Sequence, residues 1–185
     1  MFSHYLKKMK GMPDSQTHAT LSGDRTREVL WSWIGSLVGI LVLSVMDSCL
    51  CEGTDRILII ASFGASAVMV FGAVESQFAQ PRNLVGGHLI SAFIGVSAYQ
   101  LFGAHPWLAA AIAVATSTAL MQLTATLHPP GGGTALIAVI GDEKIHALGF
   151  YYLLAPVAAG VGILLITALL VNNLSGKRRY PDFWR

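Results

Sequence analysis

The sequence predicts an all-α protein, a polytopic bundle of transmembrane helices, and three observations support this. Hydrophobic residues make up 54% of the 185 residues and charged residues only 12%, whereas a soluble domain carries roughly 25% charged residues. Four long segments contain no Asp, Glu, Lys or Arg: 29–46, 84–103, 107–127 and 150–171. About 20 apolar residues in a helix span a bilayer core. Each segment therefore predicts a full span.

Two further apolar segments are interrupted or short. Residues 57–74 are uncharged but contain Gly64 and Gly72, and residues 131–141 are too few to span a bilayer. We expect four full spans plus these two glycine-interrupted segments, or up to six spans if both cross the membrane. Both arrangements give an even number of crossings.

The polar ends of the chain are too short to be domains of their own. We expect a polar cytoplasmic segment at residues 1–28, one transmembrane domain at 29–174 and a basic cytoplasmic tail at 175–185. Nine of the 12 basic residues lie in the two ends, and basic residues favour the cytoplasmic side. Both termini are therefore predicted to be cytoplasmic, and we expect the membrane to be a bacterial inner membrane.

Two stretches of the sequence resemble each other at an offset of 68 residues. Residues 64–68 and 132–136 share the order small, small, hydroxyl, alanine, aliphatic, so that Ser66 corresponds to Thr134. Each lies between two long apolar segments, which predicts an inverted repeat of two three-segment units. Discontinuous segments at matching places in two halves mark the binding site of many transporters. The alternative is that small residues recur because they permit close helix packing.

A break within the membrane is predicted at the run His128-Pro129-Pro130-Gly131-Gly132-Gly133-Thr134. The two prolines end the preceding helix, the glycines allow close approach of backbone, and the threonine can cap a helix that follows. Broken backbone at membrane depth is tolerated where it is buried in protein or lines a water-filled cavity. A simple bend in a packed protein is the alternative.

The start of such a helix favours anions, because it presents free N–H groups and the positive end of the helix dipole. Residues Gly64, Ala65 and Ser66 predict a second helix start that faces the first from the opposite side. Two facing starts without a fixed charge suit a small monovalent anion.

Two histidines are further candidates for the site. His88 lies within the segment 84–103, and His128 sits at the break. Ionisable groups at membrane depth mark ion or proton paths by default. A neutral histidine that is bonded to a carbonyl is the alternative for each.

Arg82 and Asn83 are a strongly polar pair next to the inner segments. We expect them to collect an anion at the mouth of the pathway. An ion pair of Arg82 with Glu75, or a contact with lipid phosphate, is the alternative.

Taken together, these stretches resemble the HPP family of integral membrane proteins, which is named after its His-Pro-Pro motif. The resemblance runs from Trp31 to Trp184 and rests on residues 63–68 (FGASAV), 80–83 (QPRN), 86–89 (GGHL), 128–132 (HPPGG) and the tail from Asn172 to Trp184. The family is usually described with four transmembrane helices. Its plant chloroplast and cyanobacterial members are associated with nitrite transport, so the resemblance implies nitrite as the first candidate here.

We therefore expect a membrane channel or transporter for a small monovalent anion, nitrite first, that works in the lipid bilayer as a homo-oligomer and without nucleic acid. The alternative is a membrane enzyme, or a structural or regulatory membrane subunit without transport activity. Catalysis usually needs a second polar group near the first, and the apolar segments hold no charged residue, so we do not expect an enzyme. The sequence contains no motif for ATP, another cofactor or a metal.

Overall fold

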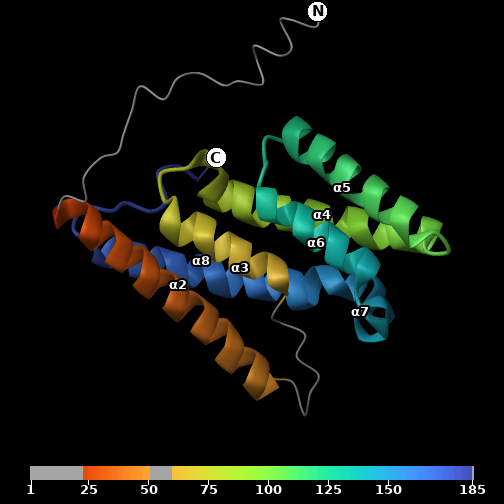
Figure 1. The fold of residues 1–185 in the computed structure, drawn as a ribbon, viewed down its shortest axis with the longest axis horizontal. Coiled ribbons are helices and arrows are strands. Elements are labelled where there is room, and N and C mark those ends of the chain that lie inside the picture. Colours follow the sequence, from red (N-terminus) through yellow and green to blue (C-terminus); the bar gives the residue numbers. More distant parts are fainter. Residues whose placement is uncertain (1–22, 51–59, 185) are drawn as a thin grey trace, which may run out of the picture.

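The computed structural model describes residues 23–50 and 60–184, and all regular elements in these ranges are helical. Figure 1 shows the arrangement. Four helices are long and apolar enough to cross a membrane, with spans at 25–49, 81–102, 106–123 and 143–174. The main helices are α2 (Gly23–Leu50), α3 (Ala61–Ala67), α4 (Pro81–Phe102), α5 (Pro106–Leu123), α6 (Pro129–Ile140), α7 (Glu143–Leu148) and α8 (Ala159–Leu174). The four predicted spans are confirmed.

Short turns of other helical types extend two of these helices. Helix α3 continues as the π-turn η1 (Val68–Gly72), and α8 is preceded by the 3₁₀ turn η3 (Gly149–Leu153) and the π-turn η4 (Leu154–Ala158); a further 3₁₀ turn, η2, covers Gln77–Ala79. The apolar helices 61–72 and 129–140 have 12 residues each, a length of about 18 Å. Each alone is too short to span a core of about 30 Å, which agrees with two further segments beside the four full spans.

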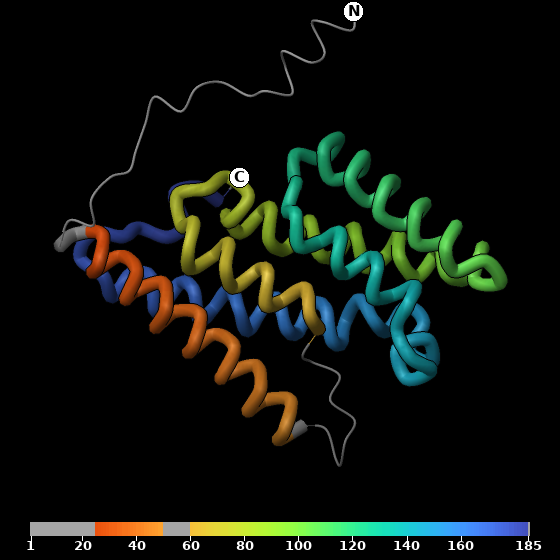
Figure 2. The backbone as a smooth tube through the Cα atoms, viewed as in Figure 1, coloured from red at the N-terminus to blue at the C-terminus, as the bar shows by residue number. Residues whose placement is uncertain are grey.

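Successive long and short helices alternate in direction, as an inverted repeat of three segments requires. The start of α2 meets the tail through an ion pair of Glu28 with Arg178 at 2.7 Å. The far end of α4 meets α7, where the rings of Tyr99 and His146 stack at 3.7 Å. Figure 2 shows α3 and α6 running antiparallel beside each other. Both ends of the described chain therefore lie on one side, in agreement with an even number of crossings.

Close packing of helices, more than removal of apolar surface from water, stabilises a bundle within lipid. Small residues permit this packing at the contact of α4 with α6: a Cβ added at Gly95 would lie 2.6 Å from the carbonyl oxygen of Ala135. The larger core side chains, among them Phe63, Phe71 and Leu164, are fully buried between α2, α3 and α8. Many large apolar side chains, among them Leu41, Trp107 and Leu170, are exposed on the outer surface, as expected for spans that contact lipid.

The helix start predicted at Gly64, Ala65 and Ser66 lies earlier in the sequence, and the interruption predicted at Gly64 is absent. Helix α3 begins at Ala61, after Ile60 as N-cap, and continues through Gly64 into η1. A single glycine weakens a helix without ending it, and no proline stands beside Gly64 to end it. Two parts of the predictions lie outside the described residues. They are residues 57–59, at the start of the predicted segment 57–74, and residues 1–22 of the predicted polar segment.

The break at the His-Pro-Pro run is confirmed, but the new helix begins earlier than the proposed cap. His128 is the N-cap of α6, and the two prolines fill its first two positions, where a missing N–H costs nothing and the fixed φ suits the helix. Thr134 therefore lies inside α6 and does not cap it.

Candidate functional site

Five side chains from α3, α4 and α6 form one hydrogen-bonded network in the interior. The Oγ of Ser66 lies 2.7 Å from Nε2 of His88 and 2.9 Å from Nε2 of His128. The Oγ1 of Thr134 lies 2.7 Å from Nδ1 of His88 and 2.8 Å from the Oγ of Ser62. All five residues are buried. The two histidines, 40 residues apart in the sequence, thus belong to one site, with ring centroids 4.9 Å apart.

The antiparallel pairing of α3 and α6 places these residues together. Ser62 and Ser66 are four residues apart and share one face of α3. The early turns of α6 pass along this face in the opposite direction, so Ser62 meets Thr134 and Ser66 meets His128. Helix α4 inserts the ring of His88 between the two contacts.

Glycines next to each histidine make this approach possible. A Cβ added at Gly87 would lie 2.5 Å from the Cβ of His128, and one at Gly131 would lie 2.9 Å from the carbonyl oxygen of Gly87 and 2.8 Å from the Oγ of Ser91. The Gly-Gly-His and His-Pro-Pro-Gly stretches are therefore the two sides of a single backbone contact.

Two groups outside the network bond to its members. Nδ1 of His128 lies 2.7 Å from the carbonyl oxygen of Phe78, in η2. The hydroxyl of Tyr152, in η3, donates to the carbonyl oxygen of Thr134 at 3.1 Å. The network is otherwise surrounded by apolar helices, because the sequences of α3, α5, α6 and α8 contain no ionisable residue. It is therefore neutral as long as both imidazoles are neutral.

The predicted site residues separate into three groups. His88, His128, Ser66 and Thr134 meet in the network. Arg82 and Asn83 instead bind backbone ahead of the break, with donors 2.7 Å and 2.8 Å from the carbonyl oxygens of Thr124 and Leu127. Gly64 and Ala65 are exposed on the other face of α3, Pro129 is exposed, Pro130 and Gly131 are buried, and Gly132 and Gly133 are half-buried.

The two helix starts do not face each other, which corrects the predicted geometry. They overlap side by side, because Ser62, in the first turn of α3, contacts Thr134 in the second turn of α6. Few N–H groups are also free at the start of α6: the two prolines have none, and the N–H of Gly131 donates to the carbonyl oxygen of His128 at 2.8 Å. The side chains of the network, rather than helix starts, are the polar groups that converge.

Sequence reasoning missed Ser62, Tyr152 and the carbonyl of Phe78. Ser62 could have been found from its spacing, since it lies one turn before Ser66 on the same helix face. A backbone carbonyl and a tyrosine 18 residues beyond Thr134 carry no comparable signal.

An apolar groove of about 800 Å³ opens between α3 and α6 beside the network. Ala65, Met69, Pro129 and Gly133 are among the residues that line it. Ser62 also lines the groove and is 4% exposed. This residue is the point at which the network approaches an open space.

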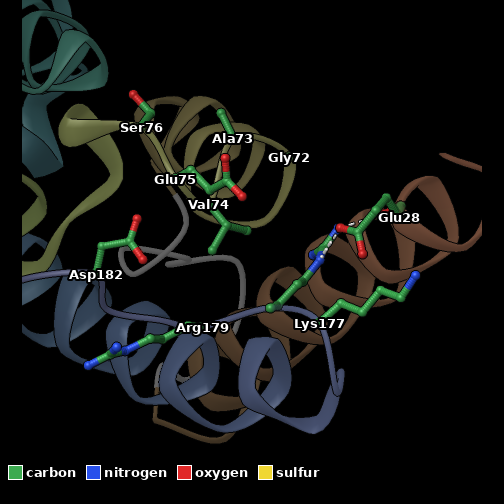
Figure 3. A pocket seen from close by; sticks show the side chains of 10 residues that line it. Glu28, Gly72, Ala73, Val74, Glu75, Ser76, Lys177, Arg179 and Asp182 are labelled. Carbon is green, nitrogen blue, oxygen red and sulfur yellow. Dashed lines mark hydrogen bonds and ion pairs between the residues drawn. The ribbon is translucent and has the colours of Figure 1, made fainter. Parts of the chain in front are cut away.

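A polar recess of about 580 Å³ lies at the C-terminal end of η1, away from the groove, where the tail meets the start of α2 (Figure 3). Arg178 is among the residues that line it. Its guanidinium binds the carboxylate of Glu28 at 2.7 Å and the carbonyl oxygen of Phe71 at 3.0 Å. Glu75 and Asp182 also line the recess, so that charges of both signs meet there.

The tail beyond this recess holds the loop that carries Phe78. The hydroxyl of Tyr180 donates to the carbonyl oxygen of Ala79 at 2.8 Å, and the N–H of Asp182 donates to Oε1 of Gln80 at 2.9 Å. Burial raises the pKa of Tyr180, so its hydroxyl remains a donor at physiological pH. Residues 175–184 are therefore a packed part of the fold and more than a basic tail.

The order of the motifs and their convergence in one site agree with a family match over residues 22–181, described as the transmembrane region of HPP proteins. The chain belongs to the HPP transmembrane family. The matched region extends from the start of α2 to the tail and contains every residue of the network. As an HPP protein, the chain is an integral membrane protein.

Two relatives from Dictyostelium discoideum carry the description "transmembrane protein". One is 44% identical over 186 residues, which cover 99% of this chain and 58% of the relative; the other is 45% identical over 160 residues, which cover 85% and 56%. This HPP chain thus spans less than two thirds of each relative. No solved structure is significantly similar to it.

Proposed function

We propose that the protein is a transporter or channel for a small monovalent anion, with nitrite as the first candidate. The observation that carries the proposal is the network of two imidazoles and three hydroxyls, which is buried among apolar helices and contains no fixed charge. Intramembrane ionisable groups that face the interior of a bundle are typical of ion and proton paths.

The network suits an anion that is bound only transiently. With both imidazoles neutral, the network carries no charge, and its hydroxyl and ring donors are bonded to one another and to the carbonyl oxygen of Phe78. Protonation of one ring adds a single positive charge, which a monovalent anion neutralises, whereas a divalent anion would leave a net charge buried at high cost. Loss of the proton removes the attraction and releases the anion.

The short helices give the network a route to open. Helices α3 and α6 meet in antiparallel register and border the groove of about 800 Å³. In many secondary transporters, one repeat rocks against the other around a site that discontinuous helices of this kind form. Cytoplasmic termini, assembly as a homo-oligomer and a bacterial inner membrane belong to the same proposal.

Flux in liposomes tests the proposal. Purified protein is reconstituted, and uptake of nitrite, nitrate, formate and chloride is measured for wild type, His88→Gln and His128→Gln. His105→Gln is the matched control, because His105 is exposed at the start of α5. We expect wild type and the control to carry nitrite and both network variants to lose flux. Transport of cations, or absence of flux for all four anions, would reject the proposal.

Hydrolysis is the second candidate, favoured by one specific observation. Ser66, His128 and the carbonyl of Phe78 follow each other at 2.9 Å and 2.7 Å, the order of nucleophile, base and orienting acceptor. Ser66 is fully buried, so its hydroxyl is not open to a substrate. This favours transport over hydrolysis. Covalent labelling of Ser66 by a fluorophosphonate in the native membrane protein would instead favour hydrolysis.

A further inference from the structure

The positions of the hydrogens in the network can be assigned from one acceptor, the carbonyl oxygen of Phe78. The carbonyl oxygen of Phe78 can only accept, so Nδ1 of His128 carries a hydrogen and donates to it at 2.7 Å. In a neutral ring the other nitrogen is then an acceptor. The hydroxyl of Ser66 must therefore donate to Nε2 of His128 at 2.9 Å. The carbonyl oxygen of Ser62 also lies 3.1 Å from the Oγ of Ser66. Of the two possible acceptors for the Ser66 hydrogen, it is the more distant.

This assignment fixes the direction of the other hydrogen bonds in the network. Because Ser66 has one hydrogen, which it gives to His128, Nε2 of His88 must be the donor to Ser66 at 2.7 Å. Nδ1 of His88 is then an acceptor, so Thr134 donates to it at 2.7 Å. The hydroxyl of Thr134 is thereby used, and Ser62 donates to Thr134 at 2.8 Å. Every hydrogen bond points from Ser62 toward His128, and the two histidines hold opposite tautomers.

We propose that this aligned chain is a proton path from the groove between α3 and α6 to His128. The proposal deepens the transport function and rests on it for the coupling of a proton to an anion. Ser62 is the entrance, because it lines the groove. His128 is the end, because its far nitrogen faces the carbonyl of Phe78.

The transfer balances in atoms and charge. A neutral acid that enters the apolar groove gives its proton to the Ser62 oxygen and leaves as the conjugate anion. The hydrogen of Ser62 moves to Thr134, and that of Thr134 moves to Nδ1 of His88. The hydrogen on Nε2 of His88 moves to Ser66, and that of Ser66 moves to Nε2 of His128.

At the end of the transfer, His128 is an imidazolium and all bonds between side chains are reversed. His88 remains neutral but has changed tautomer, from hydrogen on Nε2 to hydrogen on Nδ1. The positive charge on His128 then lies at the start of α6, where an anion compensates it. One proton and one monovalent anion would thus move together without net charge.

The other ionisable groups on the elements that pack round the pair do not interrupt this chain. Tyr152 donates to the backbone oxygen of Thr134 and not to its hydroxyl. The guanidinium of Arg82, at the start of α4, binds the carbonyl oxygen of Thr124. Glu75, on the loop before η2, is exposed and lines the polar recess at the tail.

Nitrogen-15 NMR of the reconstituted protein reads the tautomers directly and does not depend on transport. At high pH we expect hydrogen on Nδ1 of His128 and on Nε2 of His88. On acidification, His128 should become doubly protonated while His88 stays neutral and moves its hydrogen to Nδ1. Equal tautomers at high pH, or protonation of His88 before His128, would overturn the proton path.

Proton uptake with nitrite gives the second test, read with a pH-sensitive dye inside liposomes. Thr134→Val should lower proton uptake by about a hundredfold, the low end of what a positioned proton-transfer group contributes, while Thr134→Ser should retain it. Ser62→Ala, at the edge of the groove, replaces Thr134→Val if Thr134→Val does not fold. Ser97→Ala is the control for Ser62→Ala, because the hydroxyl of Ser97 donates to the carbonyl oxygen of Phe93 in its own helix, outside the network.

The outcomes separate the two proposals. Nitrite flux with unchanged proton uptake in Thr134→Val would leave the transport function standing and reject the path. The expected tautomers in a protein that moves no anion would support the path and reject the transport function.

Discussion

The hydroxyl oxygens of Ser66 and Thr134 lie at opposite nitrogens of one imidazole ring, each 2.7 Å from His88. These two residues hold the same place in the two resembling stretches, at an offset of 68 residues. The corresponding short helices α3 and α6 therefore meet at a ring that only the first half of the chain supplies. The site is therefore asymmetric, although the helix order is repeated. Removal of the ring takes the donor from Ser66 and the acceptor from Thr134.

His88→Leu should lower the stability of the protein by about 1–3 kcal/mol, because Ser66 and Thr134 become buried polar groups with a lost partner. His105→Leu changes an exposed residue and should stay within about 0.5 kcal/mol. Thermal unfolding in detergent checks both. Equal midpoints for the two variants would show that the network does not stabilise the fold.

Adjacent glycines of the His-Pro-Pro run should respond very differently to alanine. A Cβ at Gly131 would meet the carbonyl oxygen of Gly87 at 2.9 Å, whereas at Gly132 the nearest atom is a methyl of Val114 at 3.9 Å. We expect Gly131→Ala to destabilise by about 1–3 kcal/mol through overpacking and Gly132→Ala to fold normally. Size-exclusion profiles and unfolding midpoints of the pair measure this, and the reverse order would contradict the packing described here.

Two neighbouring arginines of the tail offer a third comparison. The side chain of Arg178 is 6% exposed and binds Glu28, Ser32 and the carbonyl oxygen of Phe71, whereas Arg179 is exposed. Arg178→Gln should cost about 1.5–3 kcal/mol, as for hydrogen bonds to charged groups, and Arg179→Gln should cost almost nothing. Unfolding midpoints in detergent decide this. Similar losses for both variants would point to a general effect of tail charge.

The fold could be predicted largely from the absence of charge, because backbone that spans lipid must be bonded internally, in helices or closed barrels, and uncharged runs of about 20 residues have the length of a spanning helix. The four spans and the break at Pro129 follow directly from this constraint and from proline chemistry. The continuity of α3 through Gly64 did not follow, since a glycine in an apolar run is compatible with either a break or a close contact. Here the space beside Gly64 is open, and neither feature is present.

The site was harder to predict than the fold. The sequence singled out His88 and His128 from their expected depth in the membrane, and Ser66 and Thr134 from the repeat. That these four side chains meet in one network depends on the register of α3 against α6, which small apolar residues do not specify. Arg82 and Asn83 have the polarity of site residues but support backbone, a distinction that needs coordinates.

Topology gives a fourth prediction. Nine of the 12 basic residues lie in the two ends, and basic residues are retained on the cytoplasmic side, so reporters fused at Met1 and Arg185 should both be active in the cytoplasm. A reporter fused after His105, in the turn between α4 and α5, should be active on the other side. Reporters on opposite sides for the two ends would overturn the even number of crossings.

The last prediction concerns Arg82, which is exposed at the start of α4 and donates to the carbonyl oxygen of Thr124. If its charge collects anions, Arg82→Gln should reduce nitrite flux most at low ionic strength, where the screening length is about 30 Å, and little at physiological salt, where it is about 8 Å. Arg82→Lys keeps the charge but not the planar guanidinium, and should retain flux. The order of preference among anions should not change in either variant, because a charge at the mouth acts on the rate of entry and not on the network. Equal losses in both variants at every salt concentration would assign Arg82 to the support of the turn at Thr124 instead.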